Sequence, residues 1–194
     1  MTSSQYRSVG FPFIYNYFLK NLYNDWLGSS IVFILASASK GRRTLLRKEG
    51  FKFKTMVTIT KEETFSDPKE TVIWNSVKKA ISAYCSGKEK AEEPIVACDT
   101  VVFFKGELIG KPRDREDAER ILRMLSGKWH KVYSGIAVFN GKKLKVGCSY
   151  SEVKLRKMSE KEIRKECKKK MVLRRAGAYA LQDKKNPIEK FRGW

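Results

Sequence analysis

The stretch from Ile95 to Phe104 reads IVACDTVVFF, and it decides the fold of this chain. Apolar and β-branched residues fill most of its positions, which predicts a buried strand. Asp99 interrupts the run, and a carboxylate in a buried strand is costly unless it is paired or binds a cation. We therefore expect Asp99 to act as a metal ligand or a general base. The alternative is that Asp99 lies at a sheet edge or ends one strand.

Helix and strand signals alternate on both sides of this stretch. Helices are expected over about Arg42–Lys48 and Glu70–Tyr84, after an N-cap at Asp114, and after a capping box formed by Ser159 and Glu162. Strands are expected over Ile31–Ala36, Phe51–Ile59, Glu107–Ile109, Val132–Phe139, Lys142–Tyr150 and about Glu152–Arg156, with a hairpin turn at Asn140-Gly141. Strand–helix–strand units combined with a hairpin predict an α/β fold with a mixed sheet.

The composition favours a polyanionic partner. Lys and Arg number 41 against 21 Asp and Glu, which gives a formal net charge of +20. A nucleotide, a nucleic acid or an acidic membrane surface would each suit that charge, and a solvated basic surface is the alternative. The 194 residues, 42% of them hydrophobic, are enough for one ordinary domain or for two lobes that share one sheet.

The cysteines indicate a reducing compartment. Cys85, Cys98, Cys148 and Cys167 form no C-x-x-C pair, and they do not combine with His130 in any usual zinc spacing. Because the sequence shows no secretory signal, reduced thiols in the cytoplasm are expected. His130 has no serine or cysteine motif to serve, so we expect a structural role for it.

Residues 1–30 form an N-terminal extension rich in aromatic residues. Asn16, Lys20 and Asp25 interrupt its apolar runs, so none approaches the roughly 20 apolar residues that a membrane span requires. We therefore expect no membrane span. The extension is either a packing or membrane-surface segment, or it precedes a true start of the protein near Ile31.

A phosphate-binding loop is expected between the first strand and the first helix. The segment from Leu35 to Arg43 reads LASASKGRR and holds two hydroxyls, a glycine and three cations. Backbone N–H groups at a helix start favour phosphate, and the cations add charge-assisted hydrogen bonds. The spacing of a Walker loop is absent, and an ordinary turn with exposed basic residues is the alternative.

Four further side chains are candidates for chemistry. Lys111, between a glycine and a proline, can neutralise phosphate charge in a transition state. Gln182 follows a run of small residues and can read a base edge through its paired donor and acceptor groups. Glu62 and Glu63 can supply a second metal ligand or base, although adjacent glutamates are more often merely solvated.

Four blocks in sequence order resemble the Maf family of nucleotide pyrophosphatases, over about Ile31 to Gly193. These blocks are Leu35–Ser39, Ala97–Val102, Gly110–Asp114 together with Leu125–Gly127, His130–Val132 and Ser134–Gly135, and Ala176–Gln182. The resemblance implies a Maf/Ham1-like (ITPase-like) α/β fold, with two lobes, a central mixed sheet and a cleft between the lobes. It also implies one nucleotide pyrophosphatase domain over residues 31–194, without the strand and helix with which relatives continue past Trp194.

The same resemblance implies that Mg²⁺ or Mn²⁺ assists attack of water on the α-phosphorus of a nucleoside triphosphate, which yields the monophosphate and pyrophosphate. Asp99 would accept the proton of the water and bind the metal. Glu62 would assist Asp99 and share the metal, unless a gap in the alignment gives that place to Glu63. Lys79 and Lys111 would hold and neutralise the phosphates. The implied substrate-binding residues are Ser37, Ser39, Gly41, Arg42, Arg43, Thr100 and Gln182.

The resemblance also bears on the base and on assembly. Thr100 and Gln182 carry the residue types of members that favour dTTP and UTP, whereas a branch that acts on 7-methyl-GTP differs at both positions. The implied substrate is therefore a non-canonical or a pyrimidine (dTTP/UTP-type) nucleotide. Gly41 departs from the usual S-P-R-R pattern at a position linked to substrate choice, and Met171–Arg174 replaces an acidic, proline-containing turn. Relatives imply a homodimer.

Two other functions stay open at this point. A basic protein of this fold could bind nucleic acid without catalysis, through clusters such as Lys168–Lys170 and Arg174-Arg175. Neither an RRM aromatic motif nor zinc-finger spacing is present to support that function. A septum-related regulatory role has been attached to the family name, and the residues give it no separate physical support.

Overall fold

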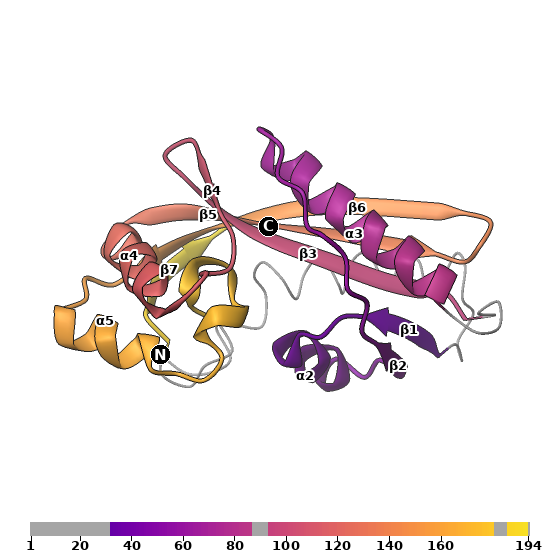
Figure 1. Ribbon diagram of the computed structural model, residues 1–194, viewed down its shortest axis with the longest axis horizontal. Coiled ribbons are helices and arrows are strands. Elements are labelled where there is room, and N and C mark those ends of the chain that lie inside the picture. The colour runs from indigo at the N-terminus through magenta and orange to yellow at the C-terminus, as the bar shows by residue number, and fades with distance from the viewer. Residues whose placement is uncertain (1–31, 87–92, 181–185, 194) are drawn as a thin grey trace. The chain divides into compact units, whose positions relative to one another are not determined.

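Seven strands form one mixed sheet in the computed structural model, which describes residues 32–86, 93–180 and 186–193 (Figure 1). The strands are β1 (Phe33–Ala36), β2 (Phe53–Met56), β3 (Ile95–Phe104), β4 (Glu107–Ile109), β5 (Trp129–Phe139), β6 (Leu144–Leu155) and β7 (Ile188–Arg192). The described helices are α2 (Lys40–Lys48), α3 (Pro68–Ser86), α4 (Arg115–Leu125) and α5 (Glu160–Cys167), with short 3₁₀ turns η3 (Val172–Arg174) and η4 (Ala176–Ala178).

The sheet combines parallel and antiparallel pairs. The strand order is β2-β1-β3-β5-β6-β7, and β4 pairs with β3 off this path. β1 is parallel to both β2 and β3, whereas the β3–β4 and β6–β7 pairs are antiparallel. The predicted α/β fold with a mixed sheet is therefore confirmed.

The chain divides into two compact units. The first unit holds the described residues up to Asp99 together with Ser134–Ser149. The second unit holds Thr100–Tyr133 and the described residues from Tyr150 to Gly193. β3, β5 and β6 supply residues to both units, so the division between units falls within strands rather than in a linker.

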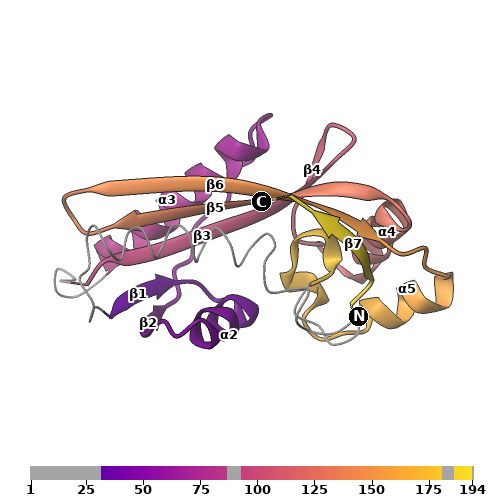
Figure 2. The same cartoon turned by 180° about the vertical axis from the view of Figure 1, so that it is seen from behind.

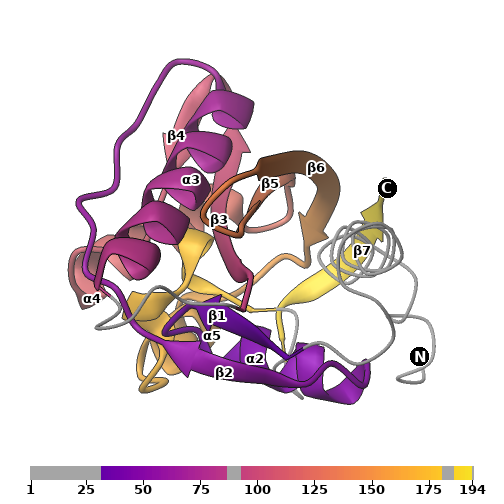
Figure 3. The same ribbon diagram turned by 90° about the vertical axis from the view of Figure 1, so that its right-hand side faces the viewer.

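In the first unit, helices cover both faces of the sheet (Figure 3). Successive residues of a strand point to opposite faces. Leu35 of β1 accordingly packs in a buried cluster with Leu46 of α2, whereas Ala36 packs in a second cluster with Ala80 of α3. Because β3 lies beside β1 and is covered in the same way, its apolar run is buried on both sides.

β5 and α3 approach each other closely at Gly135. A Cβ atom at this position would lie 2.4 Å from the carbonyl oxygen of Val72, which is too close for any side chain. Glycine in a strand often marks such an approach of a second backbone. The contact holds the N-terminal half of α3 against the sheet, and this half carries Asn75, one turn before Lys79.

In the second unit, α4 and α5 share one core with β6 and β7 (Figure 2). Leu122 of α4, Ile163 of α5, Leu155 of β6 and Ile188 of β7 belong to a single buried cluster. The helix-period spacing of the apolar residues on α4 places them on the face that meets this cluster.

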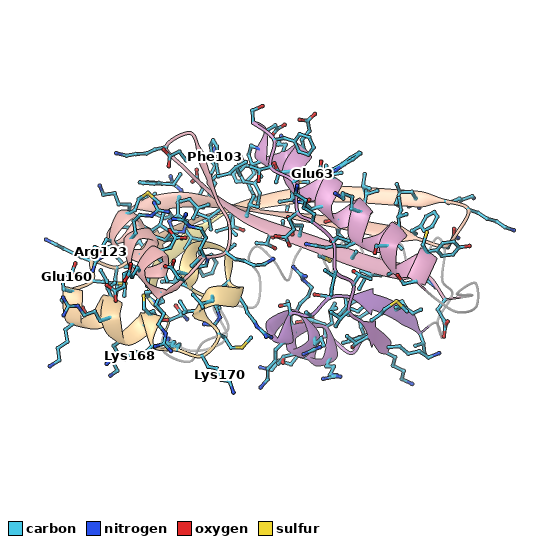
Figure 4. The ribbon with its side chains drawn as sticks, viewed as in Figure 1. Glu63, Phe103, Arg123, Glu160, Lys168 and Lys170 are labelled. Carbon is cyan, nitrogen blue, oxygen red and sulfur yellow. The ribbon has the colours of Figure 1, made fainter. Side chains whose placement is uncertain are left out.

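Caps and an ion pair fix the ends of these two helices. The side chain of Asp114 caps α4, and Ser159 and Glu162 form a capping box at the start of α5, so both predicted caps are confirmed. Arg123 of α4 also forms an ion pair with Glu160 of α5 at 2.8 Å (Figure 4).

Some of the expected element boundaries were wrong. α2 begins at Lys40 rather than Arg42, because the Ser39 side chain accepts a hydrogen bond from the backbone N of Arg42 and so caps the helix earlier. β2 covers only Phe53–Met56 of the strand expected over Phe51–Ile59.

The hairpin at Asn140-Gly141 is confirmed, but the strand that follows it begins at Leu144 rather than Lys142 and runs further than expected. β6 continues without a break to Leu155, so the separate strand expected around Glu152–Arg156 does not exist. The last part of β6 pairs with β7, a partner from far along the chain that local signals do not reveal. Residues 1–31 and Gln182 lie outside the described residues.

Candidate active site

Asp99 lies in the middle of β3, between β1 and β5, and only 5% of its surface is exposed. The sheet-edge and strand-end explanations for this acid are therefore wrong. Lys79 Nζ on α3 lies 2.5 Å from Asp99 Oδ1, and Asn75 Nδ2 lies 3.3 Å from Asp99 Oδ2. Both oxygens of the buried carboxylate thus accept hydrogen bonds from α3, which compensates for the loss of water around the charge.

Lys79 binds a second acid as well. Its Nζ lies 2.9 Å from Glu62 Oε1, on the loop that precedes α3. The side chains of Asp99 and Lys79 are 7% and 15% exposed, whereas that of Glu62 is 40% exposed. One ammonium therefore holds a buried carboxylate and a more accessible one at the same place in the first unit.

Glu63 is directed to another lysine. Its Oε1 lies 2.5 Å from Lys78 Nζ, and the hydrogen bond from Lys78 lowers the pKa of Glu63 below its usual value. Figure 4 shows Glu63 beside α3. Of the two adjacent glutamates, Glu62 is thus the one that shares a cation with Asp99.

The expected phosphate-binding loop leaves the sheet next to Asp99. Ala36 pairs with Ala97 in the parallel β1–β3 register, so Ser37 follows at the level of Cys98, next to Asp99 along β3. Ser37 is buried, and its Oγ accepts hydrogen bonds from Arg42 Nη1 at 2.7 Å and from the backbone N of Ser39 at 3.2 Å.

The start of α2 has the features of an anion site. Lys40, Gly41, Arg42 and Arg43 make up its first turn, and no acidic residue lies there. Backbone N–H groups at a helix N-terminus, the helix dipole and these cations all favour a phosphate group. The start of α2 follows β1, and Asp99 lies on the neighbouring parallel strand β3 of the same unit.

The remaining sequence-predicted residues belong to the second unit or lie outside the described residues. Thr100 follows Asp99 in β3, and Lys111 is exposed after β4. The backbone N of Gly177 donates to the carbonyl oxygen of Gly110 at 3.0 Å. Two blocks far apart in the sequence, Gly110–Asp114 and the run of small residues near Gly177, are thereby neighbours in space.

One side chain of the cluster was missed by the sequence reasoning. Asn75 is 2% exposed and contacts Asp99 directly. It precedes Lys79 by four residues and so lies on the same face of α3. That spacing was a usable signal, once Lys79 was a candidate.

His130 belongs to the second unit and is buried against Tyr179. Its Nε2 lies 2.6 Å from Tyr179 Oη, and both side chains are buried. Burial lowers the pKa of His130 to about 4 and raises the pKa of Tyr179. A histidine with such a pKa is neutral at pH 7 and fills a structural role in the core.

We expect the buried His130 to make the protein less stable in acid. Unfolded histidine has a pKa of about 6.5, so below that pH the unfolded chain takes up a proton that the folded chain refuses until about pH 4. Stability from this group is therefore present above pH 6.5 and is lost between pH 6.5 and 4. Thermal melting at pH 7 and pH 4.5 should show a smaller fall in midpoint for His130→Gln than for the wild type; parallel falls in both proteins contradict the prediction.

Within the described part of the chain, no helix is long and apolar enough to cross a membrane.

Comparison with known proteins adds family information to this geometry. The family model described as Maf-like protein matches residues 32–193. A dTTP/UTP pyrophosphatase of Thermotoga maritima is 38% identical over 150 residues, which are 77% of this chain and 73% of that protein. A dTTP/UTP pyrophosphatase of Elusimicrobium minutum is 40% identical over 154 residues, which are 78% of this chain and 81% of that protein.

Among solved structures, a nucleoside-triphosphatase (dITP/XTP pyrophosphatase) of Mycobacterium abscessus matches with a TM-score of 0.43 and 12% identity. That match covers 66% of this chain and 76% of the other.

Proposed function

The chain belongs to the Maf family, and we propose that it hydrolyses nucleoside triphosphates, above all dTTP and UTP, to the monophosphate and pyrophosphate. The observation that carries this proposal is the single ammonium of Lys79, which binds the buried Asp99 at 2.5 Å and Glu62 at 2.9 Å. The start of α2, which follows the neighbouring strand β1, supports the proposal, because a helix N-terminus favours anions and the substrate is a polyphosphate.

In the proposed reaction, Asp99 accepts a proton from a water molecule whose oxygen attacks the α-phosphorus. The bond from this phosphorus to the oxygen that bridges to the β-phosphorus breaks, so pyrophosphate leaves and the nucleoside monophosphate remains. Lys79 and Asn75 hold the Asp99 carboxylate by its two oxygens and so fix its orientation. The start of α2 binds the triphosphate, and Lys111 neutralises charge on the phosphates.

The acids of this cluster fit a hard divalent cation. The described residues contain no group of three or more His, Cys, Asp or Glu side chains suited to a metal. Mg²⁺, however, is usually held by only one or two carboxylates together with substrate phosphates and water. Asp99 and Glu62 would hold Mg²⁺ or Mn²⁺, which would supply positive charge to the phosphate oxygens when bound.

The preference for dTTP and UTP rests on two kinds of support. The relatives with 35–40% identity are named dTTP/UTP pyrophosphatases. Thr100 and Gln182 also carry the residue types of pyrimidine-preferring members, by the resemblance described above. Gly41, in the first turn of α2, departs from the family pattern at a position linked to substrate choice, and this departure weakens the support for a pyrimidine preference.

Location and assembly are part of the same proposal. Cys85, Cys148 and Cys167 are free thiols, which supports a reducing compartment such as the cytoplasm. We also propose that the protein forms a homodimer, and this part of the proposal rests on the resemblance to the Maf family.

The test is a panel of nucleoside triphosphates, each incubated with the purified protein and Mg²⁺ or Mn²⁺, with pyrophosphate as the measured product. We expect kcat/KM for dTTP and UTP to exceed that for ATP and GTP by at least about tenfold, which is the lower end of the selectivity that pocket contacts usually give. Absence of turnover with every nucleotide, together with tight and salt-sensitive binding of RNA or DNA, would instead support a nucleic-acid-binding protein.

A further inference from the structure

The loop that carries Glu62 is paired along its backbone with side chains of α3. Residues at successive turns of the helix bind alternate residues of the loop. Thr71 Oγ1 accepts from the backbone N of Phe65 at 3.0 Å, and Lys78 Nζ donates to the carbonyl oxygen of Lys61 at 3.0 Å. Between these two contacts, Asn75 binds Glu63. The loop thus runs antiparallel to the helix and is held at every second residue.

The Asn75 amide makes the central contact, and it does so twice. Its Oδ1 accepts from the backbone N of Glu63 at 2.9 Å, and its Nδ2 donates to the carbonyl oxygen of Glu63 at 2.9 Å. The side-chain amide therefore pairs with this residue as a neighbouring strand would. These two hydrogen bonds to one residue fix the register of the loop.

The register decides which glutamate shares the ammonium of Lys79 with Asp99. Glu62 and Glu63, as neighbours in the loop, direct their carboxylates to two different lysines, Lys79 and Lys78 respectively. A slip by one residue would put Glu63 in the place of Glu62, or Glu62 in the place of Glu63, as a slip between paired strands moves each residue to its neighbour's position. Only the observed register brings Glu62 to the ammonium that also binds Asp99.

Asn75 also reaches the acid itself. Its Nδ2 lies 3.3 Å from Asp99 Oδ2, in addition to its bond with Glu63. All three contacts occur in a side chain that is 2% exposed. Buried amides keep their hydrogen-bond partners because an unsatisfied polar group is costly. The loop, α3 and β3 are thus joined at this one amide.

We propose that Asn75 is a positioning residue, which holds the loop in the register that presents Glu62 to Lys79 and orients the Asp99 carboxylate. The catalytic consequence rests on the proposed pyrophosphatase function. The structural consequence does not, and the two parts of the test separate them.

The first part measures amide hydrogen exchange in Asn75→Leu, a variant of similar size that has no hydrogen-bonding group. We expect the backbone amide of Glu63 to lose its protection by about tenfold or more, whereas the amide of Phe65 keeps its bond to Thr71. Ser76→Ala is the matched control, because Ser76 is equally buried on α3 and its Oγ donates only to the carbonyl oxygen of Val72 in its own helix. Unchanged protection of Glu63 in Asn75→Leu overturns the proposal, whether or not the protein is an enzyme.

The second part measures pyrophosphate release from dTTP. We expect Asn75→Leu to lower kcat by about 10-fold to 100-fold, the usual effect of a small misplacement of reacting groups, with KM changed less than about twofold. In a Glu62→Gln background the same substitution should lower kcat by a smaller factor than in the wild type, because only its effect on the orientation of Asp99 remains. Equal losses in both backgrounds overturn the proposal and indicate a general structural defect.

A second variant covers the case in which Asn75→Leu does not fold. Asn75→Asp keeps an acceptor for the backbone N of Glu63 but loses both donors and places a second carboxylate next to Asp99. We expect the Glu63 amide to stay protected while kcat falls by at least about 10-fold. A wild-type kcat in this variant overturns the orientation of Asp99 by Asn75. If the wild-type protein is inactive but the variants show the expected exchange pattern, the proposed function is contradicted and the structural role of Asn75 stands.

Discussion

Asp99→Asn is expected to lower kcat for pyrophosphate release from dTTP and UTP by about 10² to 10⁴, the range found for loss of a general base. The amide has the shape of the carboxylate but accepts no proton from water. It also removes one of the two carboxylates that would hold the metal. Steady-state pyrophosphate release at saturating nucleotide and Mg²⁺ measures the loss directly.

The same substitution should leave the fold largely intact. Lys79 keeps Glu62 as an anionic partner at 2.9 Å, so its ammonium is not left alone in the protein. The matched control is Asp117→Asn, which changes another buried acid. Asp117 accepts from the backbone N of Arg113 at 3.1 Å and from Arg120 at 2.7 Å, and these bonds lower its pKa.

The control separates chemistry from stability. Asp117→Asn should lower the thermal midpoint, because the pair with Arg120 is lost, and it should leave kcat within about twofold of the wild type. Similar losses of kcat in Asp99→Asn and Asp117→Asn would contradict a specific role for Asp99, since both would then reflect a weakened fold.

Local signals were sufficient for much of the fold. The apolar run of β3, the caps at Asp114 and Ser159, and the Asn140-Gly141 hairpin depend on residues close together in sequence, and all three appear as expected. The end of β6 depends on its pairing with β7, in which Glu152 lies opposite Arg192 and Leu155 opposite Ile188. No local pattern encodes that pairing, so the extra strand expected there was wrong.

The site was predictable to different degrees for different residues. Asp99 could be selected on energetic grounds, because a lone acid within a buried apolar run needs a partner. Glu62 and Lys79 were selected by resemblance, since an acidic pair in a loop and a pair of lysines on a helix are common solvated patterns. Asn75 was missed because a polar residue within a helix can be assigned a role only when that face of the helix is known to be buried against β3 and the loop.

Lys79→Met is expected to destabilise the protein by about 3 to 5 kcal/mol at neutral pH, because it leaves a buried carboxylate without its cation. Met keeps most of the aliphatic length, so the change removes charge more than packing. Lys78→Met is the matched control on the next residue of α3. Its pair with Glu63 is more exposed, with side-chain exposures of 29% and 43%, so its removal should destabilise the protein far less than Lys79→Met does.

Urea unfolding of the two variants at pH 7 measures this contrast. Equal deficits in the two variants at pH 7 would mean that the Lys79–Asp99 contact behaves as a surface ion pair, and the buried acid would then need another explanation.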